Sequence, residues 1–178
     1  MSLSRHYLEN VRFEFERYKT MGEKTFKQLS PQELHWRPSE NDNSIAIIAK
    51  HLAGNMLSRW TNFLTEDGEK PWRHRDTEFE DPPNTKEELM LVWEKGWQCL
   101  FQAIEAVNES NFDANIKIRG KKHSIVQAFN RQLAHYASHV GQIVMLGKMI
   151  KGSAWTSLSI PKGQSEAFNK NLFGKTSS

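Results

Sequence analysis

The chain has 178 residues, 38% of them hydrophobic and 11% aromatic, and its 24 basic residues exceed its 21 acidic residues to give a net charge of +3. This length fits one domain, and the apolar content argues against a disordered chain. The low net charge argues against a protein whose main function is to bind DNA. The longest aliphatic run, residues 45–49, is far shorter than the about 20 residues of a membrane span, and no signal peptide is visible. The single cysteine, Cys99, fits a cytoplasmic protein without disulfides.

Two N-terminal segments carry apolar residues at steps of three and four, which is typical of helices with one buried face. The first stripe predicts a helix over about residues 4–29, which Ser30 and Pro31 end because proline disfavours a helical residue before it. Ser44 is a plausible N-cap for the second helix, whose stripe extends over residues 45–63.

The next segment, residues 66–84, has no periodicity and is interrupted by prolines and a glycine. A connection this long inside a compact domain is uncommon and is often functional. A third helix is expected to begin at Thr85, which forms a capping box with Glu88, and its apolar stripe extends over residues 89–107.

Residues 115–122 alternate apolar and basic side chains, so we expect a short extended segment there. Ser124 and Gln127 make a second capping box. The fourth helix is expected to continue from there to a glycine, Gly152.

Four amphipathic helices with one apolar stripe each predict an all-α protein, a four-helix bundle over residues 1–152 with a long loop between the second and third helices. Residues 153–178 are polar with scattered apolar anchors, among them Trp155 and Phe168. We expect them to form a C-terminal tail that packs on the bundle or on a partner subunit, with one helical turn near Glu166.

Among the seven histidines, only His135 and His139 stand four residues apart, in the middle of the fourth helix. Residues at this spacing lie on one face of a helix, where two imidazoles can bind one metal ion. Seven histidines at random positions would give ~0.23 such pairs, so the spacing alone is weak evidence. His51 lies in the second helix beside apolar residues, and burying three imidazoles is costly unless their nitrogens are paired. Histidines at the core edge that bond to side chains or water remain the alternative.

Three motifs make the sequence recognisable. Helix two opens with Ser44-Ile45-Ala46 and continues with residues 51–55, His-Leu-Ala-Gly-Asn, and helix four contains residues 135–143, His-Tyr-Ala-Ser-His-Val-Gly-Gln-Ile. Over nearly its whole length, the chain resembles the DinB/YfiT-like superfamily of metal-binding four-helix bundles. Residues 68–73 and 159–163 look like a Bacillus-type branch of uncharacterised members.

The resemblance implies a facial triad of histidines on one divalent metal, often nickel or zinc. Carried over to this chain, the triad is His51, His135 and His139. Three imidazoles leave coordination positions open, which is typical of catalytic sites, where a bound water or thiol is deprotonated near neutral pH. Similar characterised members transfer or isomerise with low-molecular-weight thiols such as bacillithiol or mycothiol, and others are described as hydrolases.

Three further residues are candidates for substrate binding. Asn55 follows His51 by one helical turn and could support the metal site or contact a substrate. The alternative is an amide that is solvated or that bridges the helices of the bundle. Gln142 could bond a ligand or be an ordinary polar residue of the helix surface. Arg73, in the long loop, could clamp a substrate carboxylate, or else be a solvated charge on a loop held by Trp72.

Two functions remain open, because both need the triad. The first is a metal-dependent enzyme, a transferase of low-molecular-weight thiols onto small electrophiles or else a hydrolase. The second is a non-enzymatic, stress-associated metal-binding protein. A pocket beside the ion would favour the enzyme, and a closed ion without a cleft would favour the second function. For partners, the sequence predicts a small-molecule substrate and a homodimer, with neither nucleic acid nor membrane.

Overall fold

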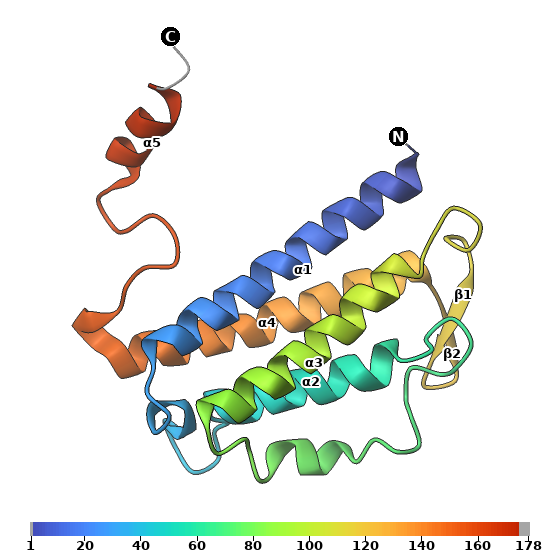
Figure 1. The fold of residues 1–178 in the computed structure, drawn as a ribbon, viewed down its shortest axis with the longest axis horizontal. Coiled ribbons are helices and arrows are strands. Elements are labelled where there is room, and N and C mark those ends of the chain that lie inside the picture. The colour runs from blue at the N-terminus through green and yellow to red at the C-terminus, as the bar shows by residue number, and fades with distance from the viewer. Residues whose placement is uncertain (1, 175–178) are drawn as a thin grey trace.

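The computed structural model describes residues 2–174. This part of the chain is mostly helical, with one small antiparallel hairpin (Figure 1). In chain order, its elements are α1 (Leu3–Gln28), η1 (Glu33–His35), α2 (Ile45–Trp60), η2 (Arg75–Phe79), α3 (Lys86–Glu105), β1 (Asn115–Ile118), β2 (Lys121–Ser124), α4 (Ile125–Lys151), η3 (Gly152–Ala154) and α5 (Ser165–Phe173).

The hydrophobic core lies between α1, α2, α3 and α4, with α2 packed mainly on α3 and α1 packed mainly on α4. Its largest fully buried side chains are aromatic: Trp93, Trp97, Tyr136, Phe15 and Phe26. The expected helical class is confirmed, but the described residues contain five α-helices instead of four, because the tail forms α5. None of the α5 residues is buried.

The sequence signals at the helix ends are confirmed. The Ser44 side chain accepts a hydrogen bond from the amide of Ile47, and the capping boxes at Thr85 and Ser124 are both formed. Helix α2 ends at Trp60, three residues before its apolar stripe does, because the backbone turns at Asn62, which has a φ of 48°. Phe63 is nevertheless buried, so the stripe predicted burial correctly and the helix end incorrectly.

The expected extended segment is a hairpin in which β1 and β2 pair antiparallel, with Asn115 opposite Ser124. Its turn consists of Arg119 and Gly120, both in the left-handed region with φ of 54° and 73°. The carboxylate of Asp67 fixes this turn, since it accepts hydrogen bonds from the amides of Arg119 and Gly120 at 2.8 and 2.7 Å. The long loop after α2 is therefore joined to the hairpin at its beginning.

The rest of that loop lies along α2, where η2 forms (Figure 1). Lys50 of α2 holds it there by donating hydrogen bonds to the carbonyl oxygens of Thr77, Glu80 and Asp81, at 2.7, 2.6 and 3.2 Å. This contact fixes the loop beside the histidine of α2.

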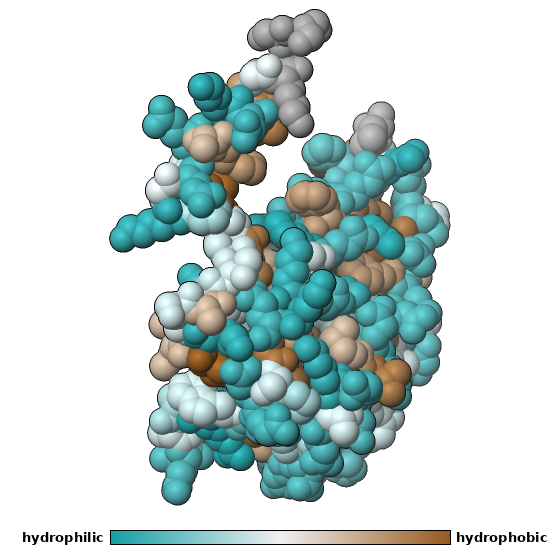
Figure 2. All heavy atoms as spheres, turned by 60° about the vertical axis from the view of Figure 1, so that its left-hand side comes forward, coloured by the Kyte–Doolittle hydropathy of each residue, from teal (hydrophilic) through white to brown (hydrophobic). Residues whose placement is uncertain are grey.

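The tail begins on the bundle and then leaves it. Thr156 exchanges two backbone hydrogen bonds with the side chain of Gln28, and Trp155 packs against Gly147 of α4. Figure 2 shows the following residues standing clear of the rest of the molecule, with apolar side chains on α5. Whether α5 covers a partner subunit stays a prediction. Among residues 2–174, none of the helices combines the length and the apolar composition that crossing a bilayer requires.

Candidate metal centre

The side chains of His51, His135 and His139 converge between α2 and α4. One ring nitrogen of each lies within 4.8 Å of the other two, and Nε2 of His135 lies 3.1 Å from Nε2 of His139. The two histidines of α4 are one turn apart, so both project from the same face. His51 is 4% exposed and meets them from α2.

Each histidine uses its Nδ1 for a bond to an acceptor oxygen. His51 Nδ1 lies 2.8 Å from Glu78 Oε2, His139 Nδ1 lies 3.1 Å from Gln142 Oε1, and His135 Nδ1 lies 3.4 Å from Gln132 Oε1. With these oxygens as acceptors, Nδ1 carries the proton in each ring, so Nε2 presents a lone pair. Such outer hydrogen bonds are the usual means of orienting histidines that bind metals.

In the tautomers that the Nδ1 bonds favour, the Nε2 atoms of His135 and His139 face each other with a lone pair on each. Burial and the nearby charges of His139, His51 and the arginines lower the pKa of His135 from 6.5 to about 4, so the ring is neutral at pH 7. Burial also lowers the pKa of His139. Bonds of about 2.0–2.1 Å to one cation place neighbouring nitrogens about 2.9–3.4 Å apart, which is the spacing that this pair has. A ring nitrogen of His51 lies within 4.8 Å of both, so the three histidines are placed to hold a metal ion once that ring moves slightly closer.

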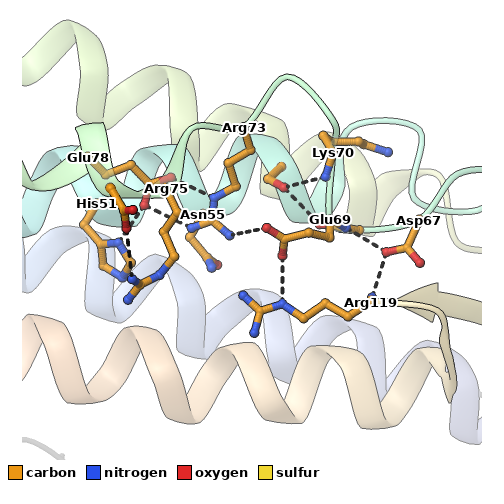
Figure 3. A network of polar contacts seen from close by, with 12 residues as sticks. His51, Asn55, Asp67, Glu69, Lys70, Arg73, Arg75, Glu78 and Arg119 are labelled. Atoms are coloured by element: carbon orange, nitrogen blue, oxygen red, sulfur yellow. Dashed lines mark hydrogen bonds and ion pairs between the residues drawn. The ribbon is translucent and has the colours of Figure 1, made fainter.

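A carboxylate that the sequence did not predict, Glu78 of η2, completes the surroundings of His51 (Figure 3). Arg73 donates to both of its oxygens, from Nε at 2.7 Å and from Nη2 at 3.0 Å. Burial by itself raises the pKa of Glu78, but the hydrogen bonds from His51 and Arg73 outweigh it and hold that pKa below its usual value. Glu78 lies directly on α2, where a Cβ at Gly54 would come within 2.6 Å of Oε1. Glycine at this position therefore leaves room for the carboxylate.

A pocket of about 410 Å³ opens beside the three histidines, and all three line it. Its volume falls in the range of sites for small molecules. The other lining residues include Asn55, Phe79, Gln132 and five arginines, namely Arg59, Arg73, Arg75, Arg119 and Arg131. Within the described residues, no carboxylate lines it. The triad therefore lies at the wall of a cationic pocket.

The three substrate-binding candidates occupy different places. Asn55 lines the pocket, and its Oδ1 accepts a hydrogen bond from the buried hydroxyl of Tyr136 at 3.1 Å. Arg73 also lines it, but its guanidinium is already bound to Glu78 and lies 3.6 Å from Glu69. Gln142 supports His139 and does not line this pocket. Contact of these residues with a substrate stays a prediction.

Sequence reasoning overlooked two of the arginines, although their spacing contains a signal. Arg59 follows His51 by eight residues on α2, and Arg131 precedes His135 by four on α4, so each lies on the helix face that carries the histidines. Glu78 has no such signal, because it comes from a segment without periodicity.

A comparison with curated proteins gave no match. A family model described as "Protein of unknown function (DUF1572)" matches residues 2–164, which include the three histidines, the pocket and the long loop. This family is DinB-like, in agreement with the resemblance seen in the sequence. The chain therefore belongs to the DUF1572 family.

Proposed function

We propose that this protein is a metal-dependent transferase of the DinB/YfiT-like superfamily, in its Bacillus-type branch, which joins a low-molecular-weight thiol such as bacillithiol to small electrophiles. One observation carries the proposal: one ring nitrogen each from His51, His135 and His139 converge at the wall of a pocket large enough for a small molecule. A site that only stabilised the fold would need no such pocket, and therefore the enzyme is favoured over a non-enzymatic metal-binding protein.

The residues of the chain have distinct tasks in this proposal. His51, His135 and His139 hold the cation, and Glu78, Gln132 and Gln142 orient their rings. A divalent cation bound there acts as a Lewis acid and lowers the pKa of a coordinated thiol toward neutrality. Phe79 stacks on the His51 ring, with centroids 4.9 Å apart, and limits the access of water to that side.

In the proposed reaction, the thiol sulfur forms a bond to an electrophilic carbon. The bond between that carbon and its leaving group breaks, and the leaving group keeps the electron pair. The thiol proton departs with the leaving group, so neither reactant is oxidised or reduced.

The test is turnover by tag-free protein loaded with nickel or zinc, given bacillithiol and a panel of small electrophiles, with the S-conjugate measured by mass spectrometry. We expect His51→Ala to lower the rate by at least about a hundredfold, while His6→Ala, an exposed histidine on α1, leaves it unchanged. Turnover no faster than that of His51→Ala, over all metals and electrophiles, would contradict the proposal. Hydrolysis of ester or amide substrates by the same loaded protein would instead support a hydrolase.

We further propose that the chain is a cytoplasmic homodimer. On α5, Phe168 and Leu172 are one turn apart and 47% and 55% exposed. A groove of about 700 Å³ between α1, α4 and the start of the tail has Phe13 and Val144 in its walls. Burial of these apolar surfaces across a two-fold axis would remove them from water. In light scattering at micromolar concentration we expect a dimer that Leu172→Asp dissociates, and a monomeric wild type would contradict this.

A further inference from the structure

Arg59, at the C-terminal end of α2, is a buried cation that forms no ion pair within residues 2–174. The residue is 3% exposed, and its Nε and Nη1 are buried without a hydrogen-bond partner in the described part of the chain. The loop backbone passes close to the guanidinium, since a Cβ at Gly68 would lie 2.9 Å from Nη1. A buried charge that lacks a partner is costly, so its presence indicates that an anion pairs with it in another state of the protein.

A second arginine faces the same space. Arg131 of α4 lines the same pocket as Arg59. It is exposed and likewise forms no ion pair among residues 2–174. Along the helix axes, Arg131 lies about 6 Å from His135 and Arg59 lies about 12 Å from His51, at about 1.5 Å per residue. The two arginines therefore occupy the end of the pocket away from the histidines.

The nearby carboxylates are already used by other partners. Glu69 forms an ion pair with Arg119 at 3.0 Å and lies 3.6 Å from Arg73 (Figure 3). Asp67 accepts hydrogen bonds from three backbone amides of the loop and the hairpin. Glu78 is shared between Arg73 and His51. The charges of Glu69 and Asp67 act on Arg59 from a distance, but neither carboxylate forms an ion pair with it.

We infer that Arg59 and Arg131 bind an oxyanion group, a carboxylate or a phosphate, at one end of a substrate whose reactive end lies at the histidines. This inference rests on the proposed function for the role of the histidines, and it adds the class of substrate: a small anionic molecule. A guanidinium is suited to this task because it stays protonated and donates two parallel hydrogen bonds to an oxyanion.

The inference is tested with metal-free protein, so that an anion cannot bind to the metal itself. Inorganic phosphate and succinate are titrated separately by calorimetry at low ionic strength. The variants are Arg59→Gln and Arg131→Gln, and the matched control is Arg37→Gln, which removes an exposed positive charge from the loop before α2. Arg131 is exposed, so its variant is expected to fold even if Arg59→Gln does not.

We expect saturable binding of at least one of the two anions, weakened about tenfold or more by Arg59→Gln and by Arg131→Gln and unchanged by Arg37→Gln. The tighter of the two anions identifies the group as phosphate or carboxylate. Absence of saturable binding, or equal weakening by all three variants, would overturn the inference. Because no metal and no turnover enter these titrations, failure of thiol transfer leaves their result intact, and transfer without anion binding would overturn this inference alone.

Discussion

Glu78 offers the sharpest perturbation, because one carboxylate accepts three hydrogen bonds from two residues. Its Oε1 accepts a hydrogen bond from Arg73 Nε, while its Oε2 accepts hydrogen bonds from both Arg73 Nη2 and His51 Nδ1. In Glu78→Gln the side chain keeps its volume, but one oxygen becomes an NH₂ group. Whichever position that group takes, a donor then faces a donor, either at Arg73 Nε or at His51 Nδ1 and Arg73 Nη2.

The magnitude follows from this geometry. A buried donor left without an acceptor costs about 1–3 kcal/mol, so the free energy of unfolding should fall by that amount. Loss of the bond that orients His51 should weaken metal binding about 10–100-fold, which corresponds to about 1.4–2.7 kcal/mol.

The assay is a competition titration of zinc and nickel against a chromophoric chelator, with urea unfolding of the metal-free protein in parallel. Glu80→Gln is the matched control, because Glu80 is exposed and its side chain makes no ion pair within the described residues. Wild-type metal affinity in Glu78→Gln would refute the assignment of Glu78 as the residue that orients His51.

Three further predictions concern packing and pH. Gly54→Ala should displace Glu78, since the new Cβ would lie 2.6 Å from its Oε1, and should weaken metal binding about tenfold in the same titration; unchanged affinity would contradict this. Gly22→Ala should lower the free energy of unfolding by about 1–3 kcal/mol, because its Cβ would lie 2.5 Å from Trp93, and an unchanged urea midpoint would count against that packing. In metal-free protein the His135 pKa of about 4 lies below that of the unfolded chain, about 6.5, so the unfolded state binds the proton first. The contribution of His135 to stability should therefore be fully present above about pH 6.5 and fall toward pH 4, by about 1–2 kcal/mol after allowance for the partial exposure of the ring. His135→Gln should remove this share of the pH dependence and leave the share of His139, whose pKa burial also lowers. Equal pH dependence of the two proteins in urea unfolding would contradict it.

Local signals predicted the helical parts of the fold. The capping boxes at Thr85 and Ser124 act within a single turn, so the sequence alone contains all their partners. The end of α2 was predicted too late, because it depends on the backbone turn at Asn62, which the pattern of apolar residues does not show. The sequence predicted only one helical turn in place of α5. A periodic pattern of apolar residues marks a helix that buries one face, and none of the α5 residues is buried.

In the candidate metal centre, too, the sequence predicted the contacts within one helix better than the contacts between distant segments. The spacing of His135 and His139 is visible in one helix, whereas the approach of His51 from α2 came from the resemblance to a family. Glu78 is a partner of His51 across 27 residues, through a loop whose path is set by Lys50 and Gly54. The unpaired state of Arg59 depends on which carboxylates bind elsewhere, and only the packed structure determines that.

The most direct test of the account is X-ray absorption at the metal edge of tag-free protein loaded with one equivalent of nickel or zinc. Three imidazole nitrogens at about 2.0–2.1 Å are expected for the wild type, and two for His51→Ala. The contradicting result would be a protein that retains no stoichiometric ion, or a first shell that His51→Ala leaves unchanged.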